Sequence, residues 1–176
     1  MMKKSRNNTK CLRRCGISLI ETVLCMLIIG GAFVASLNSI AGARASQAIA
    51  AQQRLGMVLA EDMMAEILSK TYKEGSTPGR DIGESVGNRS LFDDLDDYAT
   101  WSSTPPTDTN GNAVAGTEGY TRSVQADYVR LASPTTTTSS DEGMMRITVT
   151  VHYGKKEVAK LTSYRSDIYD TAGVGY

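Results

Sequence analysis

The chain has 176 residues and a formal net charge of zero, and its length suits one folded domain plus a short anchor. The neutral total hides a division, because residues 1–16 hold six basic and no acidic residues, whereas the remainder holds 13 basic and 19 acidic residues. An acidic remainder argues against a broad nucleic-acid surface, which needs clustered Lys and Arg, so no direct nucleic-acid partner is expected.

The three cysteines lie early in the chain, at Cys11, Cys15 and Cys25. None follows Cys25, so a disulfide framework is excluded from residues 26–176.

Residues 1–16 form a basic leader, and residues 17–37 form an apolar run in which Glu21 is the only charged residue. A helix over this run spans about 31 Å, close to the thickness of a bilayer core. Basic flanking residues favour the cytoplasmic side, so we expect a single-pass protein with its leader inside and its remaining residues outside.

Leader peptides differ in whether the protease cuts before or after the apolar segment. A secretory signal peptide is cleaved after its apolar segment. A cut after Gly16 would precede the run, so the apolar helix would stay in the mature protein.

Residues 38–74 are predicted to continue the same helix as an amphipathic half. The segment from Asn38 to Tyr72 contains no proline, and apolar residues recur at helical spacing along it. The predicted stripe consists of Ala51, Leu55, Val58, Leu59, Met63 and Ile67. Gly75 and Pro78 are expected to end the helix.

Residues 75–176 are predicted to form an outer domain that begins with a long loop over residues 75–119. Apolar and polar residues alternate over residues 120–128 and 145–153, which is typical of half-buried antiparallel strands. A turn at Gly154 leads to a third strand over about residues 157–169, and the polar residues 133–143 are expected to connect the first two strands. Arg122 is assigned to the polar set. The predicted class is α+β, with one long N-terminal helix packed on a small antiparallel sheet.

Glu21 lies one helical turn after Ile17. If a protease cut after Gly16, Ile17 would gain a free amine on the same helix face as the Glu21 carboxylate. That amine, or the amine of a neighbouring chain, could pair with the carboxylate. Left unpaired toward lipid, an acidic side chain costs roughly 3 kcal/mol.

The stretch Gly16-Ile17-Ser18-Leu19-Ile20-Glu21, with its basic leader and following apolar run, resembles the type III signal of type IV pilins and pseudopilins. The resemblance implies cleavage after Gly16 and N-methylation of Ile17, both by prepilin peptidase, and a role for Glu21 in subunit docking. It also implies the bacterial inner membrane as location, a C-terminal domain in the periplasm, and assembly with other pilins on an inner-membrane platform, with transfer to a surface pilus left open.

Four later segments, Leu59–Ile67, Phe92–Tyr98, Gly119–Arg122 and residues 145–151, are similar to minor pilins of the mannose-sensitive haemagglutinin type and to minor pseudopilins. The resemblance implies a minor structural subunit. The sequence leaves open whether the fibre is a surface pilus, a type II secretion pseudopilus or a DNA-uptake pilus.

Four carboxylates, Asp93, Asp94, Asp96 and Asp97, occur within five residues. Oxygen ligands of this kind suit calcium, but a solvated turn with local capping explains the same pattern. No metal or other cofactor is otherwise expected.

Asp108, Asn110 and Asn112 in the stretch Asp-Thr-Asn-Gly-Asn resemble the start of a calcium loop. No Glu follows at the required position, and a turn at Asn110-Gly111 explains the same residues.

No enzymatic activity is expected, because His152 is the only histidine and the outer domain holds no cysteine and no Gly-x-Ser-x-Gly motif. The alternative to a pilin is an uncut bitopic membrane protein whose periplasmic domain binds a ligand or partner.

Overall fold

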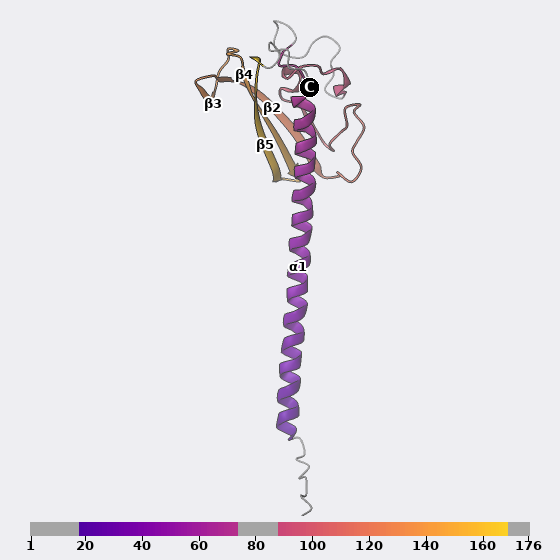
Figure 1. The fold of residues 1–176 in the computed structure, drawn as a ribbon. Helices are drawn as coiled ribbons and strands as arrows, with labels where there is room; N and C mark the ends of the chain where they lie inside the picture. The colour runs from indigo at the N-terminus through magenta and orange to yellow at the C-terminus, as the bar shows by residue number, and fades with distance from the viewer. Residues whose placement is uncertain (1–17, 74–87, 169–176) are drawn as a thin grey trace, which may run out of the picture. The chain divides into compact units, whose positions relative to one another are not determined.

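The computed structural model describes residues 18–73 and 88–168, so the leader, Gly16 and Ile17 lie outside the described residues. In chain order, it contains helix α1 (Leu19–Leu68), the 3-10 turns η1 (Arg89–Leu91) and η2 (Asp96–Tyr98), and strands β1 (Ser102–Ser103), β2 (Tyr120–Arg130), β3 (Ser133–Thr137), β4 (Met144–Tyr153) and β5 (Lys156–Ser166) (Figure 1). The predicted α+β class is confirmed.

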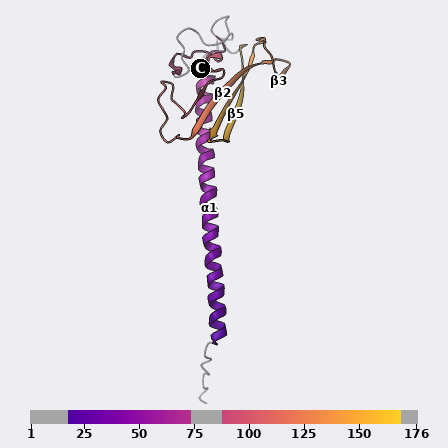
Figure 2. The same ribbon diagram turned by 180° about the vertical axis from the view of Figure 1, so that it is seen from behind.

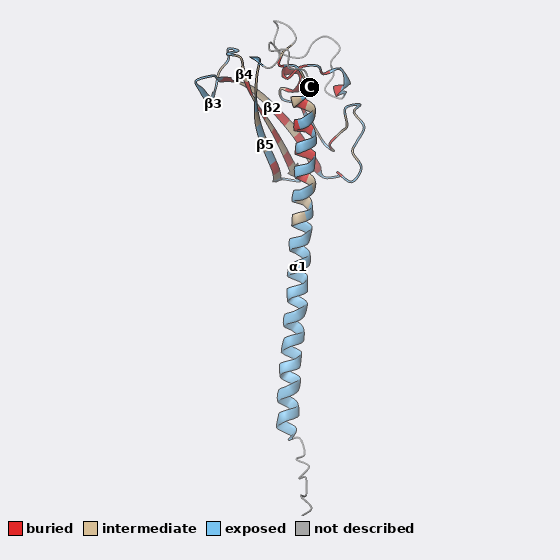
Figure 3. Ribbon diagram, in the orientation of Figure 1, coloured by how far each residue is buried: buried red, intermediate tan, exposed pale blue. Residues whose placement is uncertain are grey.

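The chain divides into two compact units, Met1–Ser46 and Gln47–Tyr176. Every described residue of the first unit is exposed (Figure 3), including the apolar side chains of α1 up to Ser46. Polar side chains in this segment are satisfied locally, since the Ser36 and Ser39 hydroxyls donate to the carbonyls of Ala32 and Ala35 at 2.8 and 3.0 Å. Such bonds to the preceding turn remove the need for an outside partner.

In the second unit, α1 packs along one face of the antiparallel sheet (Figures 1 and 2). The predicted helical periodicity is confirmed, but the buried stripe is rotated, because Ala51 is exposed and Val58 is 58% exposed. The buried helix residues are Gly56, Leu59, Ala60, Met63, Met64 and Ile67. The stripe includes Gly56 and Ala60, whose small size lets the helix approach the sheet closely.

The helix ends at Leu68, six residues before the predicted end at residue 74. The chain turns over Ser69 and Lys70, and Thr71 then forms a parallel bridge with Asp94. Its amide donates to the Asp93 carbonyl at 3.3 Å. Pairing with this distant segment replaces the helical bonds that local propensity favoured. The predicted stop residues, Gly75 and Pro78, lie outside the described residues.

The sheet has the order β1-β2-β4-β5, and β3 pairs with β2 outside this path. All the strand pairs are antiparallel. Val124 faces Val149, which faces Leu161, so the apolar sides of the three long strands form one surface. The three predicted strands are confirmed, although β5 ends at Ser166 and not at residue 169.

Two strands were not predicted. β3 lies inside the polar connection that we expected to be irregular, and it folds back on β2 with Val129 opposite Thr137. Its residues are mostly exposed, so they carry no alternation of apolar and polar residues. The two-residue β1 pairs Ser102 with Ser123 and is too short to leave a pattern.

The core joins the buried side of α1, the inner face of the sheet and aromatic residues from the segment between η1 and β1. The rings of Phe92 and Tyr98 meet edge to face at 5.0 Å, a favourable aromatic geometry. Trp101 is buried in this core, at 1% exposure.

Gly56→Ala is expected to destabilise the second unit. A Cβ at this position would lie 2.6 Å from Val158 Cγ2, and a β-branched side chain has little rotamer freedom to move away. Overpacking of this kind costs about 1–3 kcal/mol, more than the gain of up to ~1 kcal/mol from replacing a helical glycine by alanine. Urea unfolding of the full chain in detergent, followed by near-UV circular dichroism, measures the difference.

Gly42→Ala is the matched control on the same helix, because nothing lies within 4 Å of the Cβ it would add. We expect its free energy of unfolding to be unchanged or raised. A Gly56→Ala protein as stable as Gly42→Ala would show that the helix and β5 are not closely packed there.

Candidate functional site

Glu21 occupies the first turn of α1, as the sequence predicted, and it is exposed. The Ser18 carbonyl accepts the amides of Glu21 and Thr22 at 2.9 and 3.2 Å, which places the start of regular helix at Leu19. A carboxylate in a first turn is stabilised by the partial positive charge of the helix N-terminus. The two predicted cleavage-site residues, Gly16 and Ile17, lie outside the described residues.

The apolar surface that begins beside Glu21 is continuous and unburied. Long apolar side chains are 49–84% exposed from the helix start to position 34. By length and composition α1 can cross a membrane, and none of its most apolar 18-residue window is buried. Such a surface needs either lipid or other apolar helices around it.

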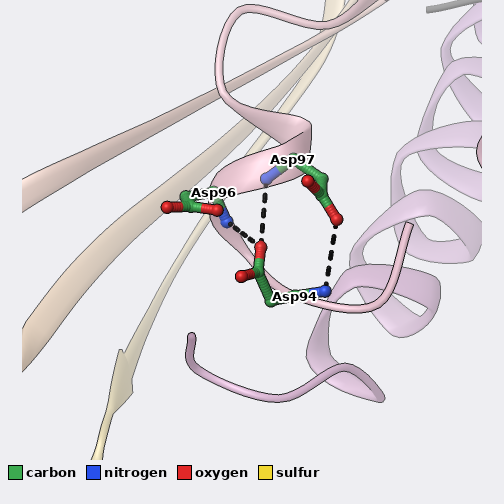
Figure 4. Close-up of side chains that lie close together, drawn as sticks. All are labelled: Asp94, Asp96 and Asp97. Atoms are coloured by element: carbon green, nitrogen blue, oxygen red, sulfur yellow. Dashed lines mark hydrogen bonds between the residues drawn. The ribbon is translucent and has the colours of Figure 1, made fainter. Parts of the chain in front are cut away.

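Three of the four candidate calcium ligands come together. One carboxylate oxygen from each of Asp94, Asp96 and Asp97 lies within 4.8 Å of the others, and all three residues are buried (Figure 4). Asp93 is exposed and is not part of this group. The prediction that the four aspartates form a solvated turn is therefore wrong for three of them.

Figure 4 also shows what these carboxylates bind within the loop. Asp97 Oδ2 accepts the amide of Asp94 at 3.3 Å. It also accepts the amide of Asp93, which the figure does not draw, at 3.0 Å. Asp94 Oδ1 accepts the amides of Asp96 and Asp97 at 3.0 and 3.3 Å. Local capping, the alternative to calcium, is therefore present and fixes the conformation around η2. Calcium binding at this loop stays a prediction.

The aspartate loop, residues 93–97, is attached to the end of α1 and to the sheet. Lys70 Nζ donates to the Phe92 carbonyl at 2.6 Å. Thr71, just after the end of α1, pairs with Asp94, and η2 contacts β2. The loop therefore contacts both the segment that follows α1 and the sheet.

The structure also contains a group of buried charged side chains that no pattern in the sequence indicated. Arg89 Nε donates to Glu66 Oε1 at 2.8 Å and Nη2 donates to Oε2 at 3.0 Å, forming a bidentate pair. Arg89 is 1% exposed, and its guanidinium carbon lies 4.4 Å from the centre of the Trp101 ring, which adds a cation–π contact. The same Glu66 Oε1 accepts the Tyr98 hydroxyl at 3.0 Å.

Arg122 is also buried, at 0% exposure. Its Nη1 donates to the Leu59 carbonyl of α1 at 3.1 Å and to Asp62 at 3.2 Å, and its Nη2 donates to the carbonyl of Thr107. Its guanidinium carbon lies 5.7 Å from the Trp101 ring centre. Assigning Arg122 to the polar face was wrong, because it shares the buried side of β2 with Tyr120 and Val124. The sequence held one signal for this burial, because Arg122 lies two residues from both Tyr120 and Val124, and residues two apart in a strand share a face.

Residues 108–112, the second candidate for a calcium loop, form a turn. Asp108 Oδ1 accepts the amides of Asn110 and Asn112 at 3.0 and 2.8 Å, and Gly111 has a φ of 86°, which glycine adopts without strain. The side-chain and backbone hydrogen bonds from Asn112 lower the pKa of Asp108. This arrangement confirms the predicted turn at Asn110-Gly111.

Comparisons of the chain with protein-family models, with curated proteins and with solved structures each found no match.

Glu66 is expected to make stability depend on acid pH. Burial pushes its pKa upward, but the hydrogen bond and charge of Arg89 outweigh burial and leave the pKa below the ordinary value of 4.5. The unfolded chain then binds more protons, so this stabilisation is present above pH 4.5 and is lost as pH falls through the lowered pKa. Glu66→Gln should lose about 1.5–3 kcal/mol at neutral pH and progressively less in acid.

Urea unfolding between pH 3 and 7 measures the gap, the difference in unfolding free energy between the parent and Glu66→Gln proteins at each pH. Glu61→Gln is the matched control, since Glu61 is exposed on the same helix, and it should leave the profile unchanged. A gap that stays constant with pH would contradict the role of the Arg89 pair.

Proposed function

We propose that this chain is a minor structural subunit of a type IV pilus or a type II secretion pseudopilus. In this proposal a prepilin peptidase cuts after Gly16 and methylates Ile17, and the subunit then moves from the inner membrane into a helical fibre or its tip. The observation that carries the proposal is the position of Glu21 in the first turn of α1, at the start of an apolar segment whose described residues up to Ser46 are all exposed.

The proposal gives the exposed apolar surface two successive environments. Lipid surrounds it before assembly, and the same helices of neighbouring subunits surround it afterwards. Within the fibre, Glu21 pairs with the amine of Ile17 from its own or an adjacent subunit, which removes the cost of an unpaired carboxylate among apolar groups. The cationic donor that pairs with Glu21 is therefore created by cleavage.

The second unit supports a role in assembly by its attachment to the helix. Buried arginines from the segment before β1 and from β2 bond to residues of α1, and the inner sheet face packs on the same helix. A domain tied to its helix in this way can be carried with the helix as it enters a fibre. We therefore assign the chain no catalytic step.

Mass spectrometry of the N-terminus tests the proposal. The chain is produced in a bacterium together with a prepilin peptidase, and we expect a mature protein that begins with N-methylated Ile17. Gly16→Leu is the control, because a larger residue before the cut should block processing. An intact leader on the parent chain would overturn the proposal and favour the uncut bitopic protein.

A further inference from the structure

An open hollow of about 440 Å³ lies on the outer face of the sheet, across β2, β4 and β5. One register row, Gln125, Thr148 and Thr162, crosses it. Side chains alternate along a strand, and the neighbour Val149 is buried in the core. The hollow therefore opens on the side of the sheet opposite α1, and its row presents two hydroxyls and an amide.

The adjacent row adds fixed charges. Arg146 Nη2 donates to Asp127 Oδ2 at 3.1 Å, and its Nη1 donates to the Thr135 carbonyl of β3 at 3.3 Å. Gln125 Nε2 donates to Asp127 Oδ1 at 3.2 Å. The side chains of the ion pair are only 23% and 26% exposed. Held from two sides, the Arg146 guanidinium is pre-organised and keeps further N–H donors for a ligand.

The hollow carries a surplus positive charge. Arg146 and Lys160 line it together with one acid, Asp127. Among the ion pairs of the described residues, none involves Lys160. The chain beyond the leader has a net charge of −6, so the positive charge at the hollow is opposite in sign to that of the chain around it. A local positive charge favours an anionic ligand.

The chemistry of the lining selects among anions. Among the described residues, no aliphatic side chain lines the hollow, so it lacks the desolvated apolar pocket in which the anchor of a protein partner is buried. Hydroxyl and amide groups instead match a ligand rich in hydroxyls. Tyr164, 44% exposed at this site, offers a ring face for the C–H groups of a pyranose.

We propose that this hollow binds a carboxylate-bearing sugar of the hexuronate class. Lys160 and Arg146 receive the carboxylate, Thr148, Thr162 and Gln125 bond to ring hydroxyls, and Tyr164 packs on the sugar face. Binding at this site is independent of whether the leader is cut, so it goes beyond the assembly role.

Saturation-transfer NMR with the full chain, in a detergent that contains no sugar, tests the proposal. The probe is sodium glucuronate, with glucose and acetate as separate probes that carry only the hydroxyls or only the carboxylate. We expect saturation transfer and a measurable Kd for glucuronate, and binding at least about tenfold weaker for each of the other two, because each lacks one set of contacts.

Two variants locate the binding. Lys160→Gln should weaken glucuronate binding roughly tenfold or more, since it removes a charge-assisted hydrogen bond. Thr162→Val, which keeps the shape of an exposed side chain, should weaken it about two- to tenfold. Lys155→Gln is the matched control, because Lys155 lies in the exposed turn before β5 and does not line the hollow.

Four outcomes would overturn the proposal. The first is the absence of saturation transfer from glucuronate, and the second is an equal effect of Lys160→Gln and Lys155→Gln. The third is equal binding of acetate and glucuronate, which would make the hollow a simple anion site. The fourth is tighter binding of an oligoglutamate peptide, which would make it a contact for an acidic protein segment.

Discussion

Glu21→Ala is expected to leave cleavage after Gly16 intact and to lower incorporation of the subunit into fibres by roughly tenfold or more. Glu21 is exposed in the first turn of α1, so nothing within the described part of its own unit depends on it. Its proposed partner is the amine of Ile17, and a charge-assisted hydrogen bond is worth about 1.5–3 kcal/mol, which corresponds to a factor of ten to a hundred.

The ratio of sheared fibre subunit to membrane-bound subunit, measured by immunoblotting, reports incorporation, and mass spectrometry reports cleavage. Thr22→Ala is the matched control on the same turn, since the Thr22 hydroxyl already donates to the Leu19 carbonyl at 2.7 Å. It should assemble normally. Normal assembly of Glu21→Ala would sink the docking role while leaving the cleavage proposal standing.

Arg89→Met should cost about 3–5 kcal/mol of unfolding free energy, because it leaves Glu66 largely buried without its cation. The Glu66 side chain is only 14% exposed, so water replaces the lost hydrogen bonds poorly. The stacked contact with Trp101 is also lost. Urea unfolding of the full chain in detergent measures the loss, and the double variant Arg89→Met, Glu66→Gln should recover part of it.

Arg130→Met is the control for this change, because Arg130 is exposed at the end of β2. Its effect should stay within about 0.5 kcal/mol. If Arg89→Met were equally mild, the buried pair would contribute specificity of packing and not stability.

Periodicity predicted the elements that carry most of the core. The apolar residues from Met145 to Val151 alternate strictly, and β4 has alternating burial along nearly its whole length. The helix was predicted with the correct period, but its buried stripe was centred on the wrong residues. Val58 is more hydrophobic than Gly56 and was therefore expected to be the buried one of the two. What decides between them is the closeness of Val158, a residue one hundred positions away that no local pattern contains.

The buried charges could not be predicted in the same way. Arg89 follows residues that read as loop, and its partners, Glu66 and Trp101, come from a helix and from the segment before β1. Composition identified the aspartate loop as a candidate site. Composition could not show that carboxylates of the loop accept hydrogen bonds from backbone amides of the same loop, because these bonds depend on the conformation around η2.

Trp101 is the only tryptophan in the chain, and it lies between elements that unfolding must separate. Because its indole is 1% exposed beside two guanidinium groups, its fluorescence emission should shift to the red when the second unit opens. The long apolar segment of α1 contains no tryptophan and adds nothing to this signal. One tryptophan therefore reports on the second unit in micelles, in membranes and in the fibres that we propose, without any label.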